Sequence, residues 1–189
     1  MKQFNLLLIF ILLLGGSCDK KTPDYSQINL VNFKGEQVAI TSMEGEWRVY
    51  VFLSPECPLS ENYTLTLSKL KKEFESGDIK FHFVFPGMFY PRPQIEQFVM
   101  VYGLSESSIH YDPAYQLRDY CKATITPEVF VIDQLGVILY RGAIDNWAIT
   151  LGKQRQVITK HYLFDALSQL SDNQVVKLNK TRAVGCIIE

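Results

Sequence analysis

The sequence predicts an α/β fold, and three observations predict it. Two segments, 47–53 (WRVYVFL) and 79–85 (IKFHFVF), are nearly continuous apolar runs rich in aromatic and β-branched residues, which is typical of strands buried on both faces. Apolar residues at helical spacing lie between them. Two further strands around a turn, and a last helix, follow at 128–170. With 189 residues, 47% of them hydrophobic, the chain can form one core but hardly two.

Residues 1–17 are expected to be a signal peptide and not part of the fold. A nine-residue apolar run at 6–14 is shorter than the roughly 20 residues that a bilayer-spanning helix needs, but it suits a secretory signal. Small residues and then Cys18 follow it, which resembles a bacterial lipoprotein signal and implies lipidation of Cys18. Cleavage without lipid and an uncleaved anchor are the alternatives. Residues 18–25 are then a polar tether, and 26–189 form the domain. We expect a lipid-anchored protein of the bacterial cell envelope, outside the cytoplasm, where disulfides persist.

The first elements of the domain are a hairpin and a helix. Strands at 28–33 and 37–40 flank the turn at 34–36. After the strand at 47–53, the apolar residues have spacings of 4, 4, 3 and 4, which predicts one inward helix face and places the residues Leu59, Tyr63, Leu67, Leu70 and Phe74 on it. The remaining expected elements are a proline-rich loop at 86–93, helices at 95–102 and from 112–113, strands at 128–132 and 137–140 around a turn at 133–136, and a long helix at 154–170.

Charge and histidine spacing exclude some classes of function. The formal net charge is −1, from 19 basic and 20 acidic residues, so nucleic-acid binding is not expected. His82, His110 and His161 do not share the short spacing of a metal motif, and neither a metal nor another cofactor is expected. The four cysteines are too few for a disulfide scaffold, so each has to be considered by its own position.

The segment from Ser54 to Ser60 (SPECPLS), between a buried strand and an amphipathic helix, resembles the active-site entry of the thioredoxin-like superfamily. Thr126-Pro127, directly before the strand at 128, resembles the superfamily's cis-proline, and the N-terminal hairpin resembles that of its redoxin branch, which includes alkyl hydroperoxide reductases and thiol-specific antioxidant proteins. The resemblance covers about residues 26–170. It implies a thioredoxin-like fold: a central mixed sheet flanked by helices, with an N-terminal β-hairpin and a helical insertion.

Cys57 is the candidate nucleophile. At the start of a helix, unpaired N–H groups and the helix dipole favour a thiolate, and Pro58 is suited to the first helical position. Glu56 would oppose ionisation if its carboxylate lay close. The alternative is that Cys57 is a small buried hydrophobic residue.

The motif departs from the thioredoxin pattern, because Ser60 stands where the second cysteine would be and cannot resolve a mixed disulfide. Cys121 lies with Ala114 and Leu117 on one helix side, which favours a core cysteine over a redox partner. For Cys186, in the segment after the last helix, a redox role with Cys57, an inert thiol and a metal role stay open. The segment has about 16 residues between 170 and 186, so at up to about 3.3 Å per residue it can reach Cys57. We expect Cys186 to lie close enough to Cys57 to form a disulfide, at least transiently.

The expected function is an extracytoplasmic, membrane-tethered thiol–disulfide oxidoreductase that acts on protein thiols and disulfides. Cys57 would attack a disulfide, Thr126 and Pro127 would shape the groove for the partner chain, and Cys186, Cys121 or an external thiol would resolve the intermediate. One alternative is a thiol peroxidase, in which Ser54 and Arg141 polarise a hydroperoxide. The other is a non-catalytic thioredoxin-fold binding or assembly module.

Overall fold

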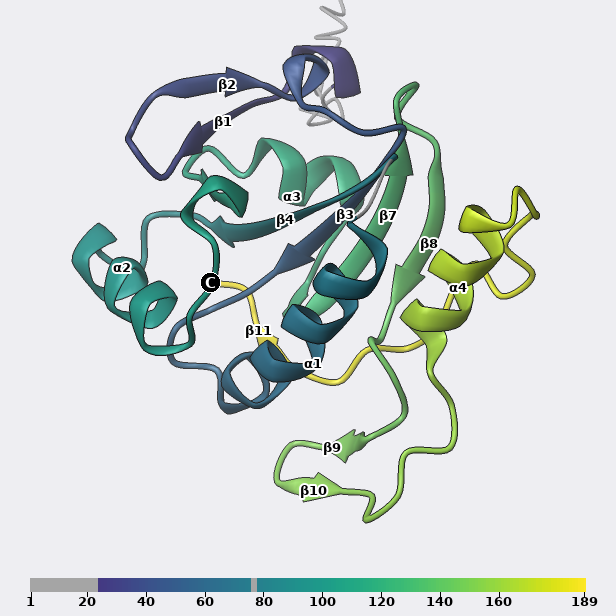
Figure 1. Ribbon diagram of the computed structural model, residues 1–189. Helices are drawn as coiled ribbons and strands as arrows, with labels where there is room; N and C mark the ends of the chain where they lie inside the picture. Colours follow the sequence, from purple (N-terminus) through teal and green to yellow (C-terminus); the bar gives the residue numbers. More distant parts are fainter. Residues whose placement is uncertain (1–23, 76–77) are drawn as a thin grey trace, which may run out of the picture.

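The computed structural model describes residues 24–75 and 78–189 (Figure 1). A central sheet contains seven strands, which are β1 (Asn29–Asn32), β2 (Gln37–Ala39), β3 (Trp47–Phe52), β4 (Ile79–Pro86), β5 (Ile109–Asp112), β7 (Glu128–Asp133) and β8 (Ile138–Gly142). Their order is β2-β1-β5-β4-β3-β7-β8. β4 is parallel to both β3 and β5, whereas all other neighbours are antiparallel. The expected mixed sheet with an N-terminal hairpin is confirmed.

The remaining elements are helices and two small ladders. The helices are α1 (Pro58–Phe74), α2 (Arg92–Val101), α3 (Gln116–Cys121) and α4 (Tyr162–Ser171), with 3-10 turns at Tyr25–Gln27, Ile40–Ser42 and Glu106–Ser108. The ladders pair β9 (Ala148–Thr150) with β10 (Lys153–Gln154), and β6 (Ile125–Thr126) with β11 (Cys186–Ile187).

Different helices cover the two faces of the sheet. Successive strand residues point to opposite faces, so Val49 and Val51 of β3 belong to one apolar cluster and Tyr50 and Phe52 to another. The first cluster contains the inward residues of α1, α2 and α4, and the second contains those of α3. The central strands β3 and β4 are therefore buried on both faces, which explains their continuous apolar sequences.

Two expected helix boundaries are wrong. The last helix begins at Tyr162, not at 154, because Asn146 Oδ1 accepts the backbone N–H groups of Thr159 and Lys160 at 3.0 and 3.1 Å and holds this segment outside the helix. The helix expected from 112–113 begins at Gln116. Asp112, where the helix was expected to begin, is the last residue of a strand, β5, that the sequence pattern did not predict.

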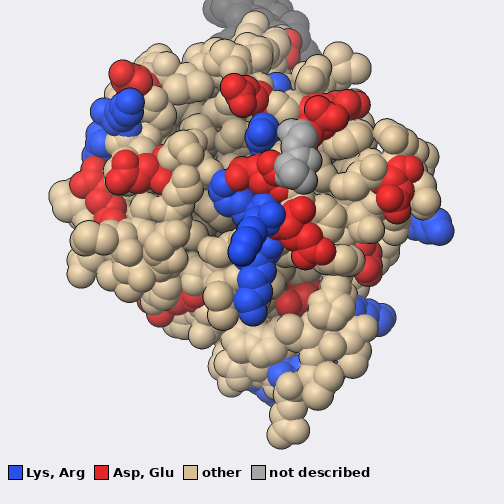
Figure 2. Space-filling model, in the orientation of Figure 1, with Lys and Arg blue, Asp and Glu red and all other residues tan. Residues whose placement is uncertain are grey.

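The calls on residues 1–17, Cys18 and most of the tether lie outside the described residues. Tyr25, the last residue of the expected tether, is buried and packs in the second apolar cluster. Within 24–75 and 78–189, none of the helices has the length and apolar character needed to cross a membrane. On the face shown in Figure 2, Lys and Arg side chains gather near the centre beside Asp and Glu side chains.

Candidate active site

The chain leaves the centre of the sheet at the end of β3 and places Cys57 at the start of α1. Cys57 is the N-cap residue, and Pro58 is the first residue of the helix. The backbone N–H of Cys57 donates to the Ser54 carbonyl at 3.2 Å, which closes the turn between strand and helix. The side chain is 1% exposed and belongs to the first apolar cluster.

Three segments that are distant in sequence converge on the Cys57 sulfur. The Cys57 thiol donates to the Thr126 carbonyl at 3.0 Å. The Thr126-Pro127 bond is cis, as expected. β11 pairs with β6 in antiparallel register, with Cys186 opposite Thr126, so Cys186 lies close enough to Cys57 for each thiol to change the pKa of the other. Figure 1 shows the C-terminal segment, in yellow, running from α4 past the C-terminal end of β8 to β11.

The pKa of the Cys57 thiol is lowered. Burial alone would raise it, but hydrogen bonds from the Cys186 thiol, the Ser60 backbone N–H, the Cys186 backbone N–H and the Ser60 hydroxyl outweigh burial. Burial and the neighbouring Cys57 raise the pKa of Cys186 to about 12. Of the two thiols, Cys57 therefore ionises first, and Cys186 serves as its proton-bearing neighbour.

Glu56 and Ser60, the neighbours of Cys57 in the sequence, point in different directions. The exposed Glu56 carboxylate accepts a hydrogen bond from Gln94 Nε2 at 2.8 Å, so it is engaged with α2. Ser60 is fully buried, and its Oγ accepts the Ser54 backbone N–H at 3.2 Å. Ser60 thus takes the position of the second cysteine in the thioredoxin pattern, and there it lowers the pKa of Cys57 as a hydrogen-bond donor.

The residues considered for peroxide polarisation have other contacts. Ser54 contributes its backbone groups to the turn before Cys57. Arg141 lies on β8, with Nη2 3.9 Å from the Glu128 carboxylate and the guanidinium 5.4 Å from the centre of the Phe130 ring. Among the described contacts of Arg141, none is with Cys57.

Cys121 occupies the core, as the favoured interpretation of its helix position predicted. It is 1% exposed and lies in the second apolar cluster with Leu117, on the face of the sheet opposite to Cys57. Burial raises its pKa well above the ordinary value. A disulfide between Cys121 and Cys57 would have to cross the sheet.

The histidines on the sheet form a pair that the sequence did not indicate. His82 Nδ1 and His110 Nε2 are 3.0 Å apart on the adjacent strands β4 and β5. Burial lowers the pKa of both, that of His110 to about 4, so the pair is neutral at pH 7. Within the described part of the chain, no group of three or more His, Cys, Asp or Glu residues could hold a metal ion.

No family model and no curated protein match the sequence. Solved structures do match it. A hypothetical protein from Sinorhizobium meliloti 1021 has a TM-score of 0.74 at 17% identity, over 88% of this chain and 92% of that chain. An uncharacterized conserved protein from Geobacillus kaustophilus has a TM-score of 0.74 at 18% identity, over 89% and 90%. A secreted Mycobacterium tuberculosis disulfide oxidoreductase homologous to E. coli DsbE has a TM-score of 0.52 at 17% identity, over 60% and 81%.

The chain has a thioredoxin-like fold. The likeness to the disulfide oxidoreductase covers 60% of the chain, whereas the first two structures extend over nearly nine tenths of it. In this thioredoxin-like fold, Cys57 and the Thr126-Pro127 segment come together as the two sequence landmarks indicated. Sequence reasoning did not find the pairing of β6 with β11, because two-residue strands leave no periodic pattern.

Proposed function

We propose that this protein is a thiol–disulfide oxidoreductase in which Cys57 is the nucleophile and Cys186 is the resolving thiol. The observation that carries the proposal is that both cysteines meet at Thr126: the Cys57 thiol donates to its carbonyl at 3.0 Å, and the β6–β11 ladder holds Cys186 opposite the same residue. The lowered pKa of Cys57 supports its role as the attacking group, since the thiolate is the nucleophile.

The reaction consists of two exchanges. The Cys57 thiolate attacks one sulfur of a partner disulfide, and the electron pair of the broken S–S bond leaves with the other sulfur, which takes up a proton. Deprotonated Cys186 then attacks the Cys57 sulfur of the mixed disulfide and releases the second partner thiolate. The partner gains two electrons and two protons, and Cys57 and Cys186 become a disulfide. An external dithiol that takes the disulfide back to two thiols completes the cycle, and each step can also run in reverse.

The second exchange requires Cys186 to lose its proton. Two of the three causes that raise its pKa are its hydrogen bond to Cys57 and the charge on Cys57. Both end when Cys57 enters a mixed disulfide, because the sulfur then carries no negative charge. Formation of the intermediate therefore makes Cys186 more acidic, and this change favours resolution.

The geometry favours exchange over the alternatives considered for this site. A peroxidase needs polarising groups at the thiolate, yet the contacts of Arg141 are with Glu128 and Phe130. A purely structural module gives no reason for two cysteines that both lie at Thr126 beside the helix start.

We propose further that the protein acts in the cell envelope, anchored through lipid on Cys18, with protein thiols and disulfides as its partners. The resemblance of residues 1–18 to a lipoprotein signal supports this, and disulfides persist in that compartment. Mass spectrometry of the membrane fraction tests the anchor: we expect a chain that begins at lipid-modified Cys18, and an intact chain that begins at Met1 would contradict the proposal.

Insulin reduction with dithiothreitol as the external dithiol tests the reaction. We expect Cys57→Ser to abolish turnover and Cys186→Ser to accumulate a mixed disulfide with insulin. Cys121→Ala is the matched control, since this thiol lies across the sheet, and it should keep the turnover of the wild-type protein. Undiminished turnover by Cys57→Ser would refute the assignment. Consumption of hydrogen peroxide without insulin reduction would instead support the peroxidase alternative.

A further inference from the structure

The segment after α4 lies across the candidate active site as a strap, which we define as residues 179–189. Its first part is fixed to the edge strand β8. The Arg141 N–H donates to the Asn179 carbonyl at 3.0 Å, and the Thr181 N–H donates to the Arg141 carbonyl at 2.9 Å. Thr181 Oγ1 also accepts the Ala143 N–H at 2.9 Å and shares a 2.7 Å hydrogen bond with the Tyr140 hydroxyl.

The second part of the strap, residues 184–189, pairs with β6 beside Cys57. Cys186 lies opposite Thr126 and Ile187 opposite Ile125, and the Ile188 N–H donates to the Thr124 carbonyl at 3.0 Å. Alternate side chains point inward: Val184 and Cys186 pack on the first apolar cluster and Ile188 on the second, while Ile187 is 80% exposed. No residue of 184–189 is fully buried, in contrast to the core strands.

Gly185 fits this pairing because it has no side chain. A Cβ atom there would lie 2.2 Å from the carbonyl oxygen of Thr126 and 2.7 Å from its carbonyl carbon. Both are backbone atoms, so neither can move aside as the end of a flexible side chain could. The β6 edge therefore accepts glycine, and no larger residue, directly before the cysteine that faces Cys57.

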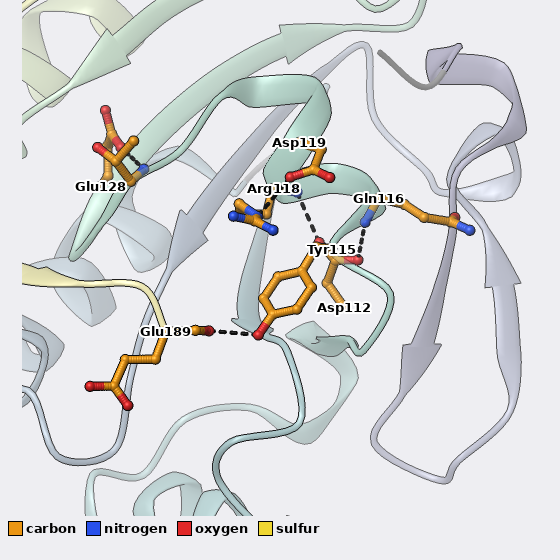
Figure 3. Close-up of polar contacts among 8 residues, drawn as sticks. Asp112, Tyr115, Gln116, Arg118, Asp119, Glu128 and Glu189 are labelled. Carbon is orange, nitrogen blue, oxygen red and sulfur yellow. Dashed lines mark hydrogen bonds and ion pairs between the residues drawn. The ribbon is translucent and has the colours of Figure 1, made fainter. Parts of the chain in front are cut away.

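A side-chain cluster holds the far end of the strap (Figure 3). The Tyr115 hydroxyl donates to the backbone oxygen of Glu189 at 2.6 Å, and the Arg118 guanidinium lies 4.1 Å from the centre of the Tyr115 ring. The Asp112 carboxylate accepts the N–H groups of Gln116 and Arg118 at 2.8 Å each, which fixes this turn. The contact with Glu189 is a single hydrogen bond, so this end of the strap can be released at modest cost.

We propose that residues 184–189 are an internal pseudosubstrate, which occupies the edge of β6 where an extended partner segment pairs, and which a partner segment with glycine directly before its cysteine displaces. The proposal rests on the proposed function and names its substrate class. An extended chain that adds to an exposed strand edge is a common mode of peptide recognition, in which backbone hydrogen bonds give affinity and side-chain fit gives specificity. Here the strap makes those backbone bonds, and Gly185 shows the fit that a partner has to reproduce.

Displacement and resolution then form one sequence. The partner segment pairs with β6 and presents one sulfur of its disulfide to Cys57, while the strap stays attached to β8 through Asn179 and Thr181. After the first exchange the strap returns and Cys186 attacks Cys57. The strap then pairs with β6 again and displaces the reduced partner from that strand. Resolution and release of the product thereby occur together.

Peptide binding without thiol chemistry tests the proposal. The probe is a fluorescein-labelled peptide, Ala-Val-Gly-Ser-Ile-Ile-Glu, in which serine replaces cysteine, and the protein is the full chain in detergent. Gly185→Ala should push the strap off Thr126, so we expect about tenfold tighter peptide binding than to the wild-type protein, because the competing strand is gone. The same peptide with alanine for glycine should bind about tenfold more weakly to this variant. Hydrogen exchange at the Ile188 amide should become faster in it.

Two further variants keep the test decisive. Ile187→Ala changes an outward side chain of the same ladder and should bind the peptide as the wild-type protein does. If Gly185→Ala does not fold, Tyr115→Phe removes one strap contact, and we expect affinity to rise by about twofold to tenfold. The proposal would be overturned if the peptide bound equally well to the wild-type protein and to Gly185→Ala (or Tyr115→Phe in its place). Equal affinity for the glycine and alanine peptides would overturn it as well.

The insulin assay is independent of these readings. Peptide binding without insulin reduction would support displacement of the strap by a peptide and refute the proposed redox function. Insulin reduction with unchanged peptide affinity would do the opposite.

Discussion

Replacing Cys186 with alanine is expected to raise the pKa of Cys57. The Cys186 thiol is the largest of the contacts that lower this pKa, ahead of the Ser60 and Cys186 backbone N–H groups. Alanine keeps the backbone N–H and the glycine before it, so the β6–β11 ladder can persist. The change therefore removes one hydrogen bond to the thiolate while burial, which opposes ionisation, remains.

The magnitude follows from the nature of that hydrogen bond. Hydrogen bonds to charged groups contribute about 1.5–3 kcal/mol, and a thiol is a weak donor, so we take the lower end of this range. At about 1.4 kcal/mol for each factor of ten, the thiolate population at a pH below the pKa falls by roughly tenfold. The rate of Cys57 alkylation at such a pH falls by less, about threefold if access is unchanged, because the more basic thiolate is intrinsically more nucleophilic.

Iodoacetamide alkylation of Cys57, followed by mass spectrometry from pH 5 to 10, measures both quantities. The pH midpoint reports the pKa, whereas the plateau rate reports access, so loosening of the strap cannot imitate the effect. Cys186→Ser is the matched control, because its hydroxyl can still donate, and its midpoint should stay low. A midpoint for Cys186→Ala that equals or lies below that of the wild-type protein would refute the assigned role of Cys186.

Three further predictions concern stability, measured by urea unfolding. Burial raises the pKa of Asp112 to about 6, above about 3.9 in the unfolded chain, so folding favours its protonated form; the wild-type protein should lose up to roughly 3 kcal/mol between pH 4 and 7, and Asp112→Asn should not. Gly142→Ala should cost about 1–3 kcal/mol, because φ is +132° and a Cβ would lie 2.3 Å from the Thr181 carbonyl oxygen. Leu67→Ala should cost about 2–5 kcal/mol at a fully buried site, whereas Leu65→Ala, at 64% exposure, should change stability by less than about 0.5 kcal/mol. A pH-independent difference for Asp112, or equal losses at the two leucines, would contradict these expectations.

The sequence predicted the elements whose apolar residues follow a regular pattern. β3 and β4 are apolar on both faces, so each appears in the sequence as a continuous apolar run. α1 is apolar on one face, so its apolar residues recur every three or four positions. β5 was missed although all four of its residues are buried, because His110 and Asp112 interrupt the apolar pattern. His110 is satisfied by His82 on the next strand and Asp112 by backbone N–H groups, and neither partner is visible in a local pattern.

The candidate site divides in the same way. Cys57 and Thr126-Pro127 are recognisable because each lies in a short motif next to a predictable strand. The approach of Cys186 to Cys57 was predicted from the missing second cysteine and the length of the last segment, but its pairing with Thr126 was not. The reason for Gly185 could not be predicted, because its backbone angles are ordinary and only the approach of a distant backbone excludes a side chain.

The acidity of Cys57 depends in part on what occupies the β6 edge. Two of the four hydrogen bonds that lower its pKa come from Cys186, one from the thiol and one from the backbone N–H, and the other two come from Ser60. When a partner displaces the strap, the two hydrogen bonds from Ser60 stay, because Ser60 belongs to α1. The partner segment then has to replace the two hydrogen bonds from Cys186. A partner segment in the same register can supply the backbone N–H, but a disulfide sulfur carries no proton to donate. Cys57 thus keeps the stabilisation that backbone and Ser60 provide and loses the thiol contact at the moment of attack, when a more basic and therefore more nucleophilic sulfur favours the exchange.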